Sequence, residues 1–309
     1  GDFLLAMPVI QSVREHLEAT SVAVVASAPS ARLAAGRSVV DRWLCPETLG
    51  AYQLFRTDLP ADDSLINVLC ESHTVLSFFS GPNHLVHKRL TDLTPADVVS
   101  IDPRPSAVTR QDRLHISLQW ANGIRRAGLP IGDPRPAAVR FDRPATSVIP
   151  RVLIHPGSGG RAKCWPMERY LELADGLPGT EVSWMLGPAD AEQARLVQDR
   201  DEPILFEADL SRAAEQMAAY DLYVGNDSGI THLAAAIGLQ TVAIFGTTDP
   251  RMWRPLGEHV TVVAPDEPQD DMACISVDDV QPAVMGRAVW LLNHLPDDDL
   301  PGVPNACSI

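Results

Sequence analysis

One glycine-rich segment combines the residue types that could hold a phosphate group. HPGSGGRAKCWP, residues 155–166, directly follows a short apolar run. Gly159 and its neighbouring glycines let the backbone approach a ligand closely, Ser158 supplies a hydroxyl, and Lys163 supplies a positive charge. The order of residues is neither that of a Walker loop nor G-x-G-x-x-G. The segment therefore indicates an anion-binding loop, with a glycine-rich turn and a solvated lysine as the alternative.

A second segment, VGNDSGITHLAAAIG at residues 224–238, joins an apolar run to an alanine-rich helical pattern. Asp227 or Ser228 can cap this helix, and His232 lies within about its first turn. The free N–H groups of a helix start, a hydroxyl and an imidazole could together hold a pyrophosphate. The alternative is a simple N-cap and a semi-buried structural histidine.

Two further places carry residues that could do chemistry. In residues 245–257, Thr247 and Thr248 follow an apolar run, and a plain turn is the favoured interpretation. Asp2, in GDFLLAMP at the start, lies in an expected loop ahead of a helical stripe over 9–19. An aspartate at a helix entrance is usually a cap, but in a cleft it could act as a general base.

The elements that position these residues alternate regularly from Arg151 onward. The expected strands are VLIHP, EVSWMLG, PILF, DLYVG, TVAIFG and HVTVVAP, with helices at PMERYLELADGL, AEQARLVQDR, LSRAAEQMAAY and THLAAAIG. This alternation predicts βαβ crossovers and a parallel, Rossmann-like sheet. Ligands bind at the carboxyl ends of such strands, where both glycine-containing segments lie.

The first half alternates less clearly but in the same style. After the helix over 9–19, the patterns predict a strand in SVAVVASA, helices at 29–35, 47–55 and 115–127, and strands at 64–70, 74–79 and 97–102. Residues 129–149 contain four prolines and no periodicity, which is typical of a linker. The expected fold is α/β, with two doubly wound domains that face each other across a cleft. Their expected limits are 1–140 and 150–285, with the end of a C-terminal helix and a tail at 286–309.

Composition excludes several classes of protein. The 309 residues are 45% hydrophobic, and 25 Lys and Arg against 40 Asp and Glu give a net charge of −15, which disfavours a nucleic-acid partner. The five cysteines are scattered, so we expect no disulfide framework, no zinc site and a reducing cytoplasm. No apolar run approaches the ~18 residues that span a bilayer. The acidic groups Asp62-Asp63 and Asp297 to Asp299 are interpreted as solvated, so no metal site is expected.

Taken in order, these segments resemble glycosyltransferase family 9, the ADP-heptose:lipopolysaccharide heptosyltransferases and their relatives. The matching stretches are GDFLLAMP, HPGSGGRAKCWPMERY, LGPADAE, YVGNDSGITHLAAAIGLQTVAIFGTTDPRMWRPLG and CISVDDV. The match is dense over 151–285 and thin over 20–145. The resemblance implies a GT-B fold, with the donor nucleotide-sugar in the C-terminal domain and the acceptor in the N-terminal one. It also implies a bacterial enzyme that transfers heptose from ADP-heptose with inversion, without a metal or other cofactor.

The resemblance also implies roles for individual residues. Asp2 matches the proposed general base and Lys163 the phosphate-contacting lysine. The turn Asp227-Ser228-Gly229 with His232 matches the start of the diphosphate-binding helix. Asp190 or Glu192, after LGPAD, falls where an acidic residue is expected to hold the ribose. A lipopolysaccharide-type or other glycan or glycolipid would be the acceptor.

Departures from the family pattern keep alternatives open. The residues that form the family's first strand would precede Gly1, so this strand is expected to be missing from the N-terminal domain. Residues 56–112 diverge, so the acceptor is not fixed by the resemblance. Another GT-B enzyme, such as a sugar-nucleotide epimerase, and a non-catalytic nucleotide-sugar-binding relative are the alternatives. The helix AVMGRAVWLLNHL at 283–295 is expected to pack on the body, which leaves at most peripheral membrane contact.

Overall fold

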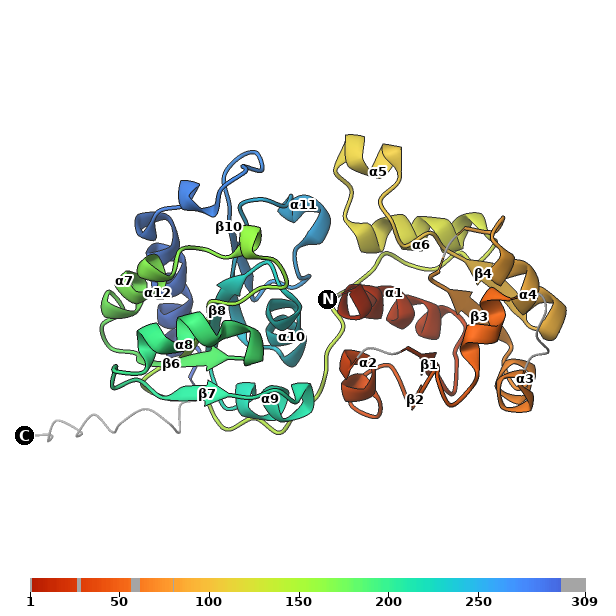
Figure 1. Ribbon diagram of the computed structural model, residues 1–309, viewed down its shortest axis with the longest axis horizontal. Coiled ribbons are helices and arrows are strands. Elements are labelled where there is room, and N and C mark those ends of the chain that lie inside the picture. The colour runs from red at the N-terminus through yellow and green to blue at the C-terminus, as the bar shows by residue number, and fades with distance from the viewer. Residues whose placement is uncertain (1, 27–28, 57–61, 80, 296–309) are drawn as a thin grey trace, which may run out of the picture. The chain divides into compact units, whose positions relative to one another are not determined.

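The computed structural model describes residues 2–26, 29–56, 62–79 and 81–295 (Figure 1). The chain divides into two compact units, Gly1–Arg140 with Asp249–Gly257, and Phe141–Thr248 with Glu258–Ile309. The sequence gives no sign that the short segment Asp249–Gly257 returns to the first unit. The predicted acidic turn Asp297 to Asp299 and most of the predicted tail lie outside the described residues.

The second unit contains one six-stranded sheet in which every strand pair is parallel. Its strands are β5 (Arg151–His155), β6 (Glu181–Leu186), β7 (Ile204–Phe206), β8 (Leu222–Asn226), β9 (Gln240–Ile244) and β10 (Val260–Val263). Its α-helices are α7 (Met167–Asp175), α8 (Ala191–Val197), α9 (Leu210–Met217), α10 (Gly229–Ile237) and α12 (Val277–Asn293), with 3₁₀ turns η2 (Arg161–Lys163), η3 (Pro188–Asp190) and η4 (Met272–Cys274). Every strand and helix predicted for residues 151–263 is confirmed.

The strand order β10-β9-β8-β5-β6-β7 places the reversal of winding between β5 and β8. From β5 the chain winds through α7, β6 and α8 to β7, and then α9 carries it back to β8 on the other side of β5. Right-handed crossovers therefore put α7 and α8 on one face, where α12 joins them in a shared apolar core, and α9 and α10 on the other. Such a switch point is where open α/β sheets bind ligands.

The register of the two central strands is fixed at their amino ends by a buried ion pair. Arg151, the first residue of β5, donates through Nε to the carboxylate of Asp221, 2.8 Å away, and Asp221 is 1% exposed. Val152 then pairs with Leu222, and His155 pairs with Gly225 at the carboxyl ends. Because β5 and β8 are short and paired to their carboxyl ends, the loops that follow them begin next to each other.

The first unit is a set of helices around two short sheets. Its helices are α1 (Asp2–His16), α2 (Pro29–Ala34), α3 (Asp63–Cys70), α4 (Leu85–Leu93), α5 (Ala107–Asp112), α6 (Ile116–Arg126) and α11 (Pro250–Trp253), with a 3₁₀ turn η1 (Ala51–Phe55). Its parallel strand pairs are β1 (Ala23–Val25) with β2 (Arg42–Leu44) and β3 (Thr74–Ser77) with β4 (Asp97–Ser100). The main core of this unit lies between α1 and α6.

Two expectations for the first unit are wrong. Residues 64–70 form helix α3 instead of a strand, because Leu65 and Leu69, four residues apart, are both buried and Asp62 caps the helix by accepting from Ser64 N. Of the helix expected over 47–55, only η1 is helical, and it is a 3₁₀ turn.

The start of α1 also differs from the expectation of a loop. The helix begins at Asp2 and continues through Pro8, although a proline inside a helix removes one backbone hydrogen bond. The continuous apolar run from Leu4 to Val9 is buried, and this packing outweighs the local cost of the proline. Within the described ranges, no helix has both the length and the hydropathy needed to cross a bilayer.

Candidate functional site

The loops that follow β5 and β8 meet at the switch point of the six-stranded sheet. Ser158 lies in the first loop and donates from Oγ to the carbonyl oxygen of Asp227, in the second, at 2.9 Å. The structure thus brings together the two segments that the sequence singled out separately. Gly159 lies in the same loop, and a Cβ built on it meets no atom within 4 Å. Sterically, therefore, this glycine is not required in the structure as it stands.

Asn226, the last residue of β8, fixes the shape of the first loop. Its Nδ2 donates to Pro156 O at 2.7 Å, and its Oδ1 accepts from Trp165 N at 2.9 Å. The side chain is fully buried. One amide thus holds both ends of the loop that carries Ser158 and Lys163. In the sequence, the only signal for Asn226 is an amide residue at the end of an expected strand, next to Asp227.

Lys163 is the cation of this site, and it is held by Asp227. The Nζ of Lys163 lies 2.6 Å from Asp227 Oδ2, and the hydroxyl of Thr248 donates to the same oxygen at 2.7 Å. The lysine side chain is 39% exposed while that of Asp227 is 10% exposed, so the lysine can still reach a ligand. This arrangement places Thr248 in the site, where the sequence favoured a plain turn.

The first turn of α10 supplies the hydroxyl and N–H groups of the site. Ser228 is the N-cap and accepts from Thr231 N, so of the two expected capping residues the structure selects Ser228. Gly229 is the first residue of the helix, and its N–H is among those that have no partner within a helix. His232 lies on the same turn with 7% of its surface exposed.

The two acidic candidates after β6 have different surroundings. Asp190 is 8% exposed, and its Oδ2 accepts from Gly187 N at 2.8 Å. Its carboxylate lies against Gly157, where a Cβ would come within 2.4 Å of Asp190 Oδ1, so only glycine fits at this position. Glu192 is exposed and forms a surface ion pair with Arg161 at 3.3 Å. Asp190 therefore packs the loops together, and Glu192 is the carboxylate that faces solvent.

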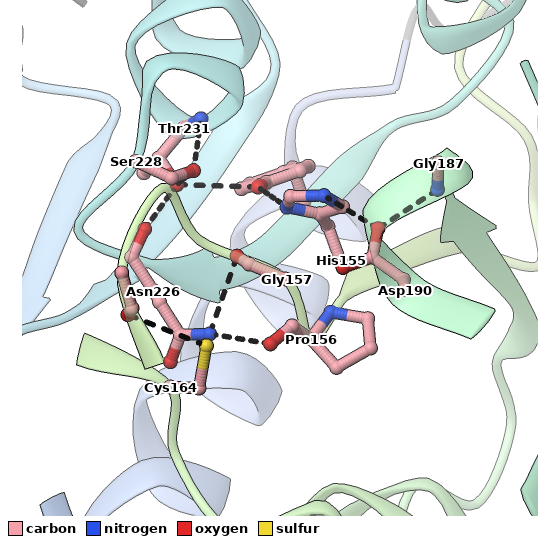
Figure 2. A network of polar contacts seen from close by, with 11 residues as sticks. His155, Pro156, Gly157, Cys164, Gly187, Asp190, Asn226, Ser228 and Thr231 are labelled. Carbon is pink, nitrogen blue, oxygen red and sulfur yellow. Dashed lines mark hydrogen bonds and ion pairs between the residues drawn. The ribbon is translucent and has the colours of Figure 1, made fainter. Parts of the chain in front are cut away.

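A buried polar chain connects Asp190 to the start of α10. Figure 2 shows His155 between Asp190 on one side and the turn of Ser228 and Thr231 on the other. His155 Nε2 lies 4.0 Å from Asp190 Oδ2, and His155 Nδ1 lies 3.2 Å from the hydroxyl of Tyr223. That hydroxyl is 3.1 Å from Thr231 Oγ1, which is 3.1 Å from Ser228 Oγ. Burial lowers the pKa of His155 to about 4, although Asp190 opposes this shift, so the imidazole is neutral at neutral pH.

The lowered pKa of His155 predicts a pH-dependent stability. The unfolded chain takes up a proton on this imidazole below about pH 6.5, whereas the folded protein does so only near pH 4. The contribution of neutral His155 is therefore fully present above pH 6.5 and is lost as the pH falls toward 4. The free energy of unfolding from urea titrations should decrease over this window. It should decrease less in a His155→Gln variant, and parallel curves for the two proteins would contradict the assignment.

Asp2 belongs to the first unit and lies apart in sequence from the loops described above. It is exposed in the first turn of α1 and is thus inside the helix, neither in a loop nor ahead of it. Among the described residues, no group of three or more His, Cys, Asp or Glu side chains is placed to hold a metal ion.

Comparison with known proteins finds a family model that matches part of this chain. Residues 130–280 match the model of glycosyltransferase family 9 (heptosyltransferase). Among curated proteins, a putative glycosyltransferase of Haemophilus influenzae is 24% identical over 185 residues, which are 50% of this chain and 54% of that protein. Lipopolysaccharide heptosyltransferase 3 of Escherichia coli is 31% identical over 119 residues, 35% of this chain and 34% of that protein. The matched part thus spans about half or less of these relatives.

Solved structures agree on the fold. ADP-heptose lps heptosyltransferase II of E. coli aligns with a TM-score of 0.64 and 21% identity, over 94% of this chain and 96% of that one. The E. coli heptosyltransferase WaaC, solved with ADP, aligns with a TM-score of 0.67 and 17% identity, over 93% and 96%. These findings confirm the predicted resemblance to family 9, which is a family of glycosyltransferase enzymes, and the predicted α/β fold of GT-B type.

Proposed function

We propose, from the glycosyltransferase family 9 match of residues 130–280, that this chain transfers a heptose or related sugar from ADP-heptose to a glycan or glycolipid of the lipopolysaccharide type. The observation that carries the proposal is the meeting of Lys163 with the start of α10 at the switch point. A cation beside free helical N–H groups is what a diphosphate needs. The transfer would take place in the bacterial cytoplasm, with at most peripheral contact to the inner membrane.

The donor half of the reaction is assigned to the second unit. The leaving ADP gains negative charge as the glycosidic bond breaks, and without a metal this charge must be met by fixed donors. Lys163 and the N–H groups of Gly229 and its neighbours are donors of this kind, and Ser228 caps the helix start that presents these N–H groups. His232 would stand beside them on the same helical turn. The loop after β6, with Asp190 inside it and Glu192 at its surface, would lie at the ribose.

The acceptor half of the reaction is assigned to the first unit. An inverting transfer needs a group that takes the proton of the acceptor hydroxyl as that oxygen attacks the anomeric carbon. Asp2 is our candidate, since its carboxylate is exposed to solvent. The proton moves to Asp2, the new glycosidic bond forms to the acceptor oxygen, and the bond to the diphosphate breaks on the opposite side of the ring.

Replacement of Lys163 tests the donor site most directly. Lys163→Ala removes a charge-assisted contact to phosphate, which is worth about 1–3 kcal/mol, so the affinity for ADP should fall roughly 5- to 150-fold. Titration calorimetry with ADP measures this, and UDP and GDP report on the selectivity for the base. The wild-type protein should bind ADP in preference to the other two.

The chain offers a matched control for this variant. Its only other lysine, Lys88, is exposed on α4 in the first unit, and Lys88→Ala changes the net charge by the same amount. We expect unchanged ADP affinity for this control. Equal affinities in wild type and Lys163→Ala would assign the lysine to a solvated surface contact, and a wild-type protein that binds no nucleotide would refute the donor site.

A further inference from the structure

We propose that His155 and Tyr223 are positioning residues, which couple the loop after β6 to the start of α10 so that the two ends of the donor are bound cooperatively. This inference rests on the proposed function, because the two ends are assigned to the ribose and the diphosphate. It goes beyond that function because neither residue needs to touch the donor.

The polar contacts between Asp190 and the start of α10 are continuous. His155 ends β5, Tyr223 lies within β8, and Thr231 lies on α10, so three separate elements contribute to one chain of polar groups. Tyr223 and Thr231 are fully buried, and His155 is 7% exposed. Separating buried polar groups that are connected in this way costs free energy, since each would lose its partner without forming a hydrogen bond to water instead.

The backbone makes room for both Asp190 and Tyr223, the two groups that contact the imidazole. A Cβ on Gly225 would lie 2.4 Å from the hydroxyl of Tyr223, and a Cβ on Gly157 would lie 2.4 Å from Asp190 Oδ1. These two glycines stand at the carboxyl ends of neighbouring strands, because Gly225 pairs with His155 and Gly157 follows it by two residues. Larger side chains there would displace the groups that contact the imidazole.

The number of protons in this buried chain limits how its members can pair. Thr231 Oγ1 donates to Asn226 O, so it can only accept from its other neighbours, and Ser228 can donate to it. The single proton of Tyr223 then goes either to Thr231 or to His155 Nδ1. The negative charge of Asp190 favours a proton on His155 Nε2, which leaves Nδ1 as an acceptor for Tyr223. The direction in which the Tyr223 hydroxyl donates its proton thus depends on Asp190, through the imidazole of His155.

This dependence gives the two ends a physical link. A shift of the loop that holds Asp190 changes which imidazole nitrogen carries the proton, and so whether Nδ1 accepts from Tyr223 or donates to it. Tyr223 in turn changes what it offers to Thr231, on the turn where Ser228 caps α10. A donor that orders one end therefore reduces the cost of ordering the other.

The test is a double-mutant cycle on ADP binding, measured by calorimetry. Asp190→Asn perturbs one end and Ser228→Ala perturbs the other, and their combined effect should differ from the product of the single effects by about threefold or more, as for coupled sites. The same cycle in a Tyr223→Phe background should be additive, because the linking hydroxyl is gone. Tyr223→Phe alone should weaken ADP binding about two- to tenfold, by the loss of a hydrogen bond of the buried network.

Tyr170 provides the matched control. It is a second fully buried tyrosine of the same unit, and its hydroxyl has no hydrogen-bond partner among the described residues. Tyr170→Phe should leave both the ADP affinity and the coupling unchanged, which separates the lost link from the general loss of a buried hydroxyl. If Tyr223 had only a structural role, Tyr223→Phe would lower the free energy of unfolding but would not remove the coupling between Asp190→Asn and Ser228→Ala.

The outcomes separate this inference from the function on which it rests. Coupling that disappears with Tyr223→Phe but survives Tyr170→Phe supports the inference. Additive effects of Asp190→Asn and Ser228→Ala in a wild-type protein that binds ADP would overturn the inference alone, as would coupling that persists in the Tyr223→Phe background. A wild-type protein that binds no ADP would overturn the proposed function, and the inference with it.

Discussion

An Asp2→Asn variant should lose transfer activity by about 10²–10⁴-fold while its affinity for ADP stays close to that of the wild type, because general-base catalysis contributes this much to rate. The amide has nearly the shape of the carboxylate but cannot accept the proton of the acceptor hydroxyl. Asp2 belongs to the first unit, whereas the residues assigned to the donor belong to the second. Loss of rate with retained ADP binding is therefore the expected signature.

The measurement needs a control for the loss of a negative charge at a helix start. Asp63 is also an exposed aspartate in the first turn of a helix, α3, in the same unit. Asp63→Asn should lose at most the ~0.3–1 kcal/mol of stability expected for a surface charge at a helix start. It should keep the transfer rate. A transfer assay with ADP-heptose and a lipopolysaccharide-type acceptor, followed by product analysis, gives both rates.

Three results would change the assignment. An unchanged rate in Asp2→Asn would remove Asp2 as the base. A product that is an altered nucleotide-sugar instead of a new glycoside would favour an epimerase. A wild-type protein that binds ADP without forming any product would favour the non-catalytic nucleotide-sugar-binding alternative.

The second unit could be predicted well from the sequence because its strands are buried on both faces. β5, β8 and β9 are buried along almost their whole length and contain the short apolar runs VLI, LYV and VAI, so length and flanking turns identify them. The first unit has strands of three or four residues with mixed exposure. In that unit, tertiary packing decides the structure more than the local sequence pattern does. As a result, residues 64–70 form a helix, and α1 continues past Pro8.

The site, too, has residues that the sequence predicts and residues that it does not. Lys163, Ser158 and Ser228 could be predicted because glycine-rich turns and a capping residue mark loops after strands. Asn226 and Tyr223 could not, and a plain turn was the favoured interpretation for Thr248, because each looks like an ordinary strand or turn residue until the fold shows what it contacts. A contact across 61 residues, such as that of Asn226 with Trp165, leaves no periodicity in the sequence.

Asn226 is therefore the residue whose replacement should damage the site most. Asn226→Ala removes the partners of Trp165 N and Pro156 O, which lie in the interior. An unpaired buried polar group costs about 1–3 kcal/mol, so the free energy of unfolding should fall by about 3–5 kcal/mol once the lost packing of the amide is included. Urea titration measures this loss. Asn67→Ala, on the exposed side of α3, is the control and should stay within about 0.5 kcal/mol of the wild type.

Amide hydrogen exchange shows whether the damage is local to the loop. In the wild type, the N–H of Trp165 is bonded to a buried oxygen and should exchange slowly. In Asn226→Ala it should exchange faster than the N–H groups of β5 and β9, and ADP affinity should fall because the loop no longer fixes Ser158 and Lys163. Slow exchange at Trp165 with unchanged ADP affinity would mean that the loop keeps its shape without Asn226. The uniform acceleration of all amides would instead assign Asn226 to the stability of the whole unit.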